Sequence, residues 1–154
     1  ANNDPAADYP AAVLALGATI TTTARSIAAD DFFTGMFATA LAEDEIISEI
    51  RFPVPEKAGY AKFPNPASRY AMTGVFVART KDGVRVAVTG AGPCVFRVAE
   101  MEAALAANFA PAAVENIRID PTDLNSDIHG SAEYRANLVT VMAKRAVVQA
   151  LGSS

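Results

Sequence analysis

The chain has 154 residues, of which 51% are hydrophobic and 19% charged, so it can bury a core and differs from disordered sequences. Its 13 Lys and Arg and 17 Asp and Glu give a net charge of −4, without the basic cluster typical of nucleic-acid-binding proteins. With 1 Cys and 1 His, the chain cannot form an internal disulfide or supply a zinc or iron–sulfur site alone.

The sequence shows no apolar run near the roughly 20 residues that span a bilayer, so we expect no membrane segment. The first four residues, Ala-Asn-Asn-Asp, form neither the basic nor the apolar region of a signal peptide. We therefore expect a soluble, cytoplasmic protein. The start in loop-like sequence without a Met predicts that the chain continues a segment lying upstream.

The first third of the chain predicts short elements. Asp8 is a typical N-cap and Gly17 a typical C-terminal stop for a helix of about two turns. The β-branched residues 18–28 favour two strands joined by a tight turn. Asp30 is expected to cap a second short helix, and residues 45–52 to form a strand that ends at prolines. The second helix would present four apolar side chains to the core: Phe32, Phe33, Met36 and Phe37.

The proline-rich residues 53–66 are the best internal boundary, because the pattern beyond them changes to a hairpin followed by helices. Asp82-Gly83 separates two apolar runs and predicts the hairpin turn. Residues 99–109 read as a helix, and Ser131 is expected to cap a long terminal helix. This order of elements indicates an α+β fold. The predicted buried face of the terminal helix consists of Tyr134, Leu138, Val141, Met142, Arg145 and Val148.

No catalytic constellation or metal site is visible in the sequence, so we assign neither catalytic nor metal-binding residues. His129 is expected in a solvated loop, and Cys94 as a small buried apolar residue. The acidic residues 30–31 and 43–45 are interpreted as helix-end and surface charges. The stretch from Gly90 to Pro93 lacks the third glycine of a dinucleotide fingerprint, and its proline removes an N–H donor, so we do not expect a phosphate loop.

Seven motifs, taken in chain order, resemble the FAD-binding medium subunit of molybdenum hydroxylases of the carbon monoxide dehydrogenase and xanthine dehydrogenase type. The resemblance covers nearly the whole chain. The motifs are Asp4-Pro5-Ala-Ala-Asp8-Tyr-Pro10, Ala15-Leu-Gly-Ala18, Asp31-Phe-Phe-x-Gly35, Glu43-x-Glu-Ile-Ile-Ser-Glu-Ile-Arg-Phe-Pro53, Tyr60-x-Lys-Phe63, Ala67-Ser-Arg-Tyr-Ala71, and Ala132-Glu-Tyr-Arg135 with Arg145-Ala146.

The resemblance implies that the chain is the C-terminal part of such a subunit. Family members carry two glycine-rich loops that hold the FAD pyrophosphate before the Asp-Pro segment, and this chain begins just past the second. Residues 1–55 would then be the end of an FAD-binding α+β subdomain. Residues 56–154 would form a small C-terminal domain with an antiparallel sheet and packed helices.

Four positions match cofactor-binding positions of the family, and two more lie in the same loop as the first of them. Asp8 would hold polar atoms of FAD, although a plain helix N-cap remains an alternative, and Asn3 and Asp4 could add hydrogen bonds from the same loop or have plain loop roles. Ile47 would touch the flavin or serve only as strand core. The resemblance also places Lys62 near the pyrimidine end of the ring and Tyr70 beside its face, with a surface lysine and a strand-start aromatic as their plain structural readings.

The resemblance further implies a role in electron transfer. The subunit would pass electrons from [2Fe–2S] clusters on a small partner subunit through FAD to an external acceptor, while a large partner subunit carries the molybdenum–pterin cofactor. A preceding N-terminal FAD-subdomain segment would complete the flavin site, so the chain alone would not be active. The alternative is a non-catalytic assembly or scaffold domain that kept the fold without binding flavin.

Overall fold

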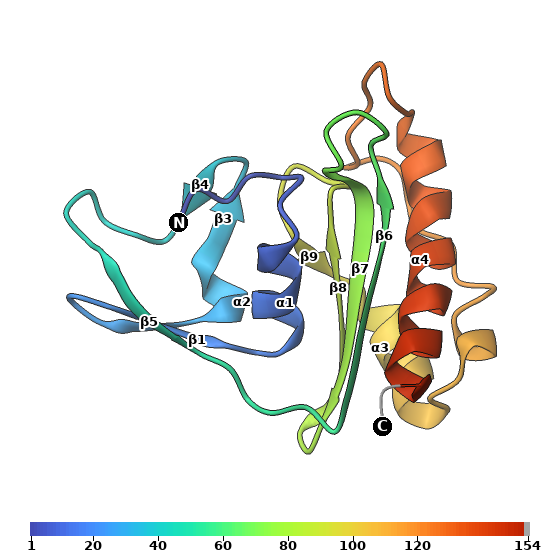
Figure 1. Ribbon diagram of the computed structural model, residues 1–154, viewed down its shortest axis with the longest axis horizontal. Coiled ribbons are helices and arrows are strands. Elements are labelled where there is room, and N and C mark those ends of the chain that lie inside the picture. The colour runs from blue at the N-terminus through green and yellow to red at the C-terminus, as the bar shows by residue number, and fades with distance from the viewer. Residues whose placement is uncertain (153–154) are drawn as a thin grey trace.

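The computed structural model describes residues 1–152, and a four-stranded antiparallel sheet runs through its middle (Figure 1). Its strand order is β6-β7-β8-β9. The strands are β6 (Lys57–Pro64), β7 (Ala71–Thr80), β8 (Gly83–Thr89) and β9 (Phe96–Arg97). One face is covered by α3 (Ala99–Ala107) and α4 (Ala132–Gly152), with the 3₁₀ turn η1 (Pro111–Ala113) between them in sequence. The α+β class is confirmed.

The two faces of this sheet pack against different parts of the chain, because successive side chains of a strand point to opposite sides. Val75 and Val77 of β7 belong to a core cluster with Val139 and Met142 of α4. Ala78 of the same strand belongs to a second cluster, which includes residues of the N-terminal helix. The central sheet is therefore buried on both faces and joins the two halves of the chain.

The buried face of α4 differs in part from the predicted face. Leu138 and Met142 are buried as expected, but Tyr134 and Val148 are 43% and 57% exposed. The helix instead turns small residues toward the sheet, among them Ala143, Ala146 and Ala150, all of which are fully buried. The reason lies at Gly59 of β6, where an added Cβ would overlap the carbonyl oxygen of Ala146. Backbone meets backbone there, so small residues rather than large apolar ones mark the contact.

The N-terminal part packs on the opposite face of the sheet (Figure 1). Its first helix, α1, covers Tyr9–Ala15, and its three-stranded antiparallel sheet has the order β2-β1-β5. The strand pair predicted over residues 18–28 is confirmed as β1 (Thr19–Thr22) and β2 (Ser26–Ala28), and the predicted strand over 45–52 as β5 (Ile47–Arg51). The remaining elements are α2 (Ala29–Phe32), β3 (Phe33–Gly35) and β4 (Ala38–Thr39).

The predicted second helix is much shorter than expected. It ends at Phe32, and the chain continues as the β3–β4 hairpin, whose turn places Phe37 in a left-handed conformation with φ +54°. Met36 and Phe37 are consequently 51% and 57% exposed rather than part of a core face. Asp30 does not cap α2, because Ala28 holds that position. Its carboxylate instead accepts hydrogen bonds from two arginines, Arg85 and Arg97.

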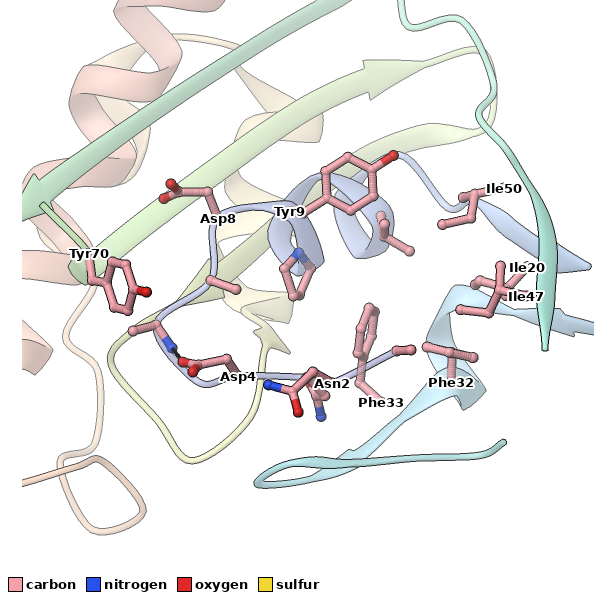
Figure 2. A pocket seen from close by; sticks show the side chains of 16 residues that line it. Asn2, Asp4, Asp8, Tyr9, Ile20, Phe32, Phe33, Ile47, Ile50 and Tyr70 are labelled. Carbon is pink, nitrogen blue, oxygen red and sulfur yellow. Dashed lines mark hydrogen bonds between the residues drawn. The ribbon is translucent and has the colours of Figure 1, made fainter. Parts of the chain in front are cut away.

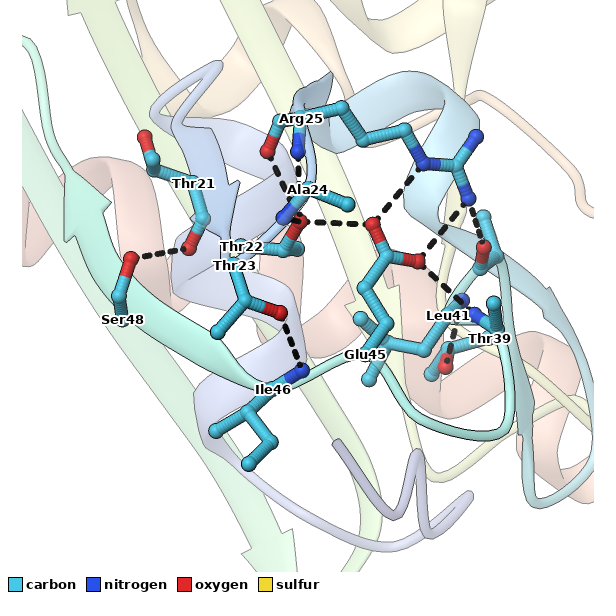
Figure 3. Close-up of polar contacts among 12 residues, drawn as sticks. Thr21, Thr22, Thr23, Ala24, Arg25, Thr39, Leu41, Glu45, Ile46 and Ser48 are labelled. Atoms are coloured by element: carbon cyan, nitrogen blue, oxygen red, sulfur yellow. Dashed lines mark hydrogen bonds and ion pairs between the residues drawn. The ribbon is translucent and has the colours of Figure 1, made fainter.

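Glu45, expected as a surface charge, is 8% exposed and organises the loops around the small sheet (Figure 3). Its carboxylate accepts hydrogen bonds from the Thr22 hydroxyl at 2.6 Å and from Nε of Arg25 at 3.0 Å. It also accepts the backbone N–H of Ala42 at 2.8 Å. These donors hold the pKa of Glu45 at about 2, with the Arg25 hydrogen bond as the largest cause.

The predicted turns and stops are confirmed at three places. Gly17 follows α1 with φ +61°, a conformation that favours glycine. Thr80 pairs with Gly83 across the predicted hairpin turn. The Ser131 hydroxyl accepts the backbone N–H of Tyr134 and so caps α4. Within residues 1–152, no helix is both long and apolar enough to cross a bilayer.

Candidate functional site

A cavity of about 460 Å³ opens between the first eight residues, α1 and the small β2-β1-β5 sheet (Figure 2). This volume lies in the range of small-molecule sites. The lining residues are Ala1, Asn2, Asn3, Asp4, Ala6, Ala7, Asp8, Tyr9, Pro10, Val13, Ile20, Phe32, Phe33, Ile47, Ile50 and Tyr70. The cavity therefore joins segments from four separate stretches of sequence with the residue just before β7.

The two ends of the cavity differ in polarity (Figure 2). Ile20, Ile47 and Ile50 lie at one end, on the small sheet, whereas Asp8 and Tyr70 lie at the other. Among the described lining residues there is no Lys or Arg. Such a cavity suits a flat, mostly apolar group with hydrogen-bonding atoms along one part of its edge.

The segment that carries Asp4 is fixed to the end of β8. The Thr89 hydroxyl donates to the carbonyl of Ala7 at 2.6 Å, and the Gly90 N–H donates to the carbonyl of Pro5 at 2.7 Å. Asp4 closes a local turn, because its Oδ1 accepts the N–H of Ala6 at 2.9 Å. The segment thus has a defined backbone conformation although it belongs to no helix or strand.

Asn3 has a structural part in the site. It is 5% exposed and adopts φ +48°. Its Nδ2 donates to the carbonyls of Gly35 at 2.6 Å and Ala38 at 2.7 Å, and lies 3.3 Å from Sγ of Cys94. The side chain therefore connects the cavity segment to the β3–β4 hairpin. Cys94, which the sequence predicted to be a buried apolar residue, is only half-buried.

Asp8 stands at the N-cap position of α1, but its side chain makes no cap hydrogen bond. The predicted cap is wrong because φ −72° and ψ −38° are helical angles, whereas a capping residue is extended and turns its side chain back to the first amides. The carboxylate instead reaches β6. It lies 2.7 Å from Nζ of Lys62 and accepts a hydrogen bond from the Tyr60 hydroxyl.

Tyr70 precedes β7 at the edge of the cavity and is 61% exposed. Its loop is held by Asn65, whose N–H donates to the carbonyl of Tyr70 at 2.7 Å. The Asn65 Oδ1 also accepts the N–H of Ala67 at 2.9 Å. The hydrogen bond between Asn65 and Tyr70 therefore joins the two ends of the loop, and the Tyr70 ring lies beside the opening of the cavity.

The cavity brings together five of the six predicted positions, namely Asn3, Asp4, Asp8, Ile47 and Tyr70. Lys62 is not among its lining residues and reaches the site only through Asp8. Tyr60, which contacts the same carboxylate, belongs to one of the seven motifs but was not among the predicted site residues. Its position two residues before Lys62 on one strand, and hence on the same face, was the available signal.

Residues 1–55 match the family described as the FAD binding domain in molybdopterin dehydrogenase. The resemblance to the medium subunits is confirmed. The chain is 35% identical to the nicotine 6-hydroxylase medium subunit of Paenarthrobacter nicotinovorans, over 97% of this chain and 58% of that protein. It is 32% identical to the carbon monoxide dehydrogenase medium chain of Afipia carboxidovorans, again over 97% of this chain and 58% of the relative.

The fold agrees with solved medium-subunit structures. A chain of reconstituted CO dehydrogenase from Oligotropha carboxidovorans superposes with a TM-score of 0.82 at 27% identity, covering 99% of this chain and 59% of that one. A carbon monoxide dehydrogenase from Hydrogenophaga pseudoflava gives 0.82 at 29% identity, covering 98% and 58%. The chain thus spans a little over half the length of these medium subunits. All cavity-lining residues except Tyr70 lie within the stretch that matches the FAD-binding family.

Proposed function

We propose that this chain builds one wall of the FAD site in the medium subunit of a molybdenum hydroxylase. The observation that carries the proposal is the coincidence of the cavity with the FAD-binding family match, since every lining residue but Tyr70 lies within residues 1–55. The opposed apolar and polar ends fit an isoalloxazine ring, which has a hydrocarbon edge and a hydrogen-bonding edge. The residues present therefore fit the ring of the cofactor.

The predicted residues that line the cavity then have distinct parts. Ile47 and its apolar neighbours exclude water from the hydrocarbon edge of the ring. Asp8 and Asp4 accept hydrogen bonds from hydroxyl groups of the cofactor, and Tyr70 offers an aromatic face beside the ring. Asn3 acts indirectly, because its side chain donates hydrogen bonds that hold the β3–β4 hairpin next to the cavity. Residues 56–154 support this wall through the β8 contacts with the Asp4 segment.

The described residues of the cavity lack the groups needed to bind the pyrophosphate of FAD, so another segment must bind it. A pyrophosphate requires several N–H donors or cations, whereas Asp4 and Asp8 carry negative charge and no described lining residue is Lys or Arg. A preceding N-terminal FAD-subdomain segment would supply that cradle. The division into an FAD subdomain over residues 1–55 and a C-terminal domain over 56–154 belongs to the same proposal.

In the assembled cytoplasmic enzyme, bound FAD would supply reversible electron transfer to an external acceptor. The electrons would come from [2Fe–2S] clusters on a small subunit, after oxidation of the substrate at the molybdenum–pterin cofactor on a large subunit. The residues of this chain bind and orient the ring, shield it from water and set the charge near it. None of them takes part as a chemical catalyst.

The test is a pair of neighbouring substitutions in the intact complex. Ile47→Asp places a carboxylate at the apolar end of the cavity, whereas Ile46→Asp alters a side chain that is 67% exposed and does not line it. We expect the flavin absorption band to fall sharply in the first variant and to remain in the second. A complex that carries no flavin before substitution, or equal flavin content in both variants, would contradict the proposal, and the former would favour the scaffold alternative.

A further inference from the structure

We propose that Tyr60 is a positioning residue for the flavin site, acting through Asp8 and Lys62 and not by contact with the cofactor. The inference rests on the proposed function of the cavity. Tyr60 is not among the residues that line the cavity, but its hydroxyl donates a hydrogen bond to Oδ1 of Asp8, which does line it.

The side chains of Tyr60 and Lys62 both contact the Asp8 carboxylate on one face of β6. Tyr60 and Lys62 are two residues apart, so both project to the same side of the strand. Tyr60 binds Oδ1 of Asp8, and Nζ of Lys62 lies 2.7 Å from Oδ2. Each carboxylate oxygen thus has one donor from β6, which fixes the plane of the carboxylate. The remaining lone pairs are available to a hydroxyl or N–H group of a ligand.

The tyrosine hydroxyl is held in place by its surroundings. Its ring stacks on Phe76, the cross-strand partner, with centroids 6.0 Å apart and an angle of 28° between the planes. Gly74 lies beneath the hydroxyl, and a Cβ at that position would overlap it. Burial, together with the nearby Asp8 carboxylate, raises the pKa of Tyr60. The phenol therefore remains protonated and acts as a permanent donor.

Without this hydroxyl, only Lys62 would hold the Asp8 carboxylate. The Asp8 side chain is 46% exposed, so water can compete for the vacated oxygen and the carboxylate can turn toward the ammonium group. Both groups would then shift relative to a bound ring. The expected consequence is weaker cofactor binding and an altered flavin environment, with little change in the fold.

The primary experiment is Tyr60→Phe in the complete flavin-loaded complex, with Tyr134→Phe as a matched control. Tyr134 lies on α4, outside the cavity, so its substitution removes a hydroxyl without touching Asp8. We expect the dissociation constant of FAD to rise about five-fold in Tyr60→Phe, as for loss of one net hydrogen bond, and to change less than about two-fold in the control. The reduction potential and visible spectrum of the flavin should also change only in Tyr60→Phe.

A double-substitution cycle tests the route through Asp8. In an Asp8→Asn background, Tyr60→Phe should add less than about two-fold to the FAD dissociation constant, because the charged acceptor is already lost. Gly74→Ala should reproduce the effect of Tyr60→Phe by displacing the hydroxyl. Unchanged affinity, potential and spectrum in Tyr60→Phe, or an equal effect in both backgrounds, would overturn the inference while a flavin-binding wild type upholds the proposed function. A wild-type complex without flavin would contradict the proposed function itself.

Discussion

The N-terminal part of the chain and the sheet with its two helices are stabilised in different ways. The strands β1 to β5 are only 2 to 5 residues long, and their loops are connected by side chains such as Glu45 and Asn3 that bind several groups at once. The strands β6 to β8 are 7 to 10 residues long and pack through a continuous apolar cluster on α4.

This difference determines which substitutions each part tolerates. A short strand contributes few ladder hydrogen bonds, so a buried polar side chain that satisfies several loop groups becomes a main support of the cavity wall. The sheet and α4 depend instead on volume, because closely packed interiors allow little change at a helix–strand contact. We therefore expect polar substitutions to disturb the N-terminal part most and volume changes to disturb the sheet most.

The largest effect is expected at Met142 of α4, which is 1% exposed in the main apolar cluster. Met142→Ala should lower the free energy of unfolding by about 2–5 kcal/mol, through lost burial and a residual cavity. The control, Val148→Ala, changes a residue of the same helix that is 57% exposed and should alter it by less than about 0.5 kcal/mol. Denaturant unfolding measures both, and similar values would place Met142 outside the core.

An increase in side-chain volume tests the close contact between the backbones of β6 and α4 at Gly59. Gly59→Ala should cost about 1–3 kcal/mol, because its Cβ would overlap the backbone of α4. Gly35→Ala in β3 is the matched control, since its Cβ would only come to 4.0 Å from Cβ of Ala38. Thermal or denaturant unfolding should therefore separate the two variants clearly. A cost at Gly35 equal to that at Gly59 would contradict the contrast between the two parts.

Acid should remove the support that Glu45 gives to the N-terminal part. Its pKa in the folded protein is about 2, below the ordinary value of 4.5, so its contribution is complete above pH 4.5 and declines as the pH falls toward 2. Glu45→Gln should thus be less stable than wild type at pH 7, with a difference that shrinks over this window. Glu49→Gln, at an exposed ion pair, should stay close to wild type throughout. A Glu45→Gln difference independent of pH would contradict this account.

The sequence predicted the elements best where local signals and packing agree. The Asp82-Gly83 turn and the Ser131 cap are local features, and the structure confirms both. The buried face of α4 was partly wrong because alanines carry little hydrophobic signal, although Gly59 makes them the closest contacts. The second helix was too long in the prediction because the hairpin that ends it depends on Asn3, about 30 residues away in the chain.

The candidate site was predictable only through the resemblance. Periodicity and spacing do not indicate that Ile47 and Tyr70 line the same cavity as Asp8, because the fold alone brings them together. Tyr60 was missed since its role depends on Asp8 lacking the extended conformation of a capping residue. With helical angles, Asp8 makes no cap hydrogen bond, and its carboxylate accepts one from Tyr60 instead. Glu45 was interpreted as a surface charge because its partners, Thr22 at the end of β1 and Arg25 in the turn that follows, lie 23 and 20 residues away in the chain.

The smallest and most specific effect is expected at Lys62, where the two parts of the chain meet through its ion pair with Asp8. A cation near the flavin favours the anionic reduced form, so Lys62→Met should lower the reduction potential of the bound flavin. Asp8 already compensates much of that charge, and the shift should therefore be on the order of tens of millivolts with little loss of stability.

Asp8→Asn leaves the ammonium group uncompensated and should shift the potential upward. Lys57→Met, which removes a cation at the far end of β6, should leave it unchanged. Potentiometric titration of the loaded complex distinguishes these cases. Unchanged potentials in Lys62→Met and Asp8→Asn would show that the flavin does not sense this pair, and shifts of the same sign in both would contradict the account based on charge.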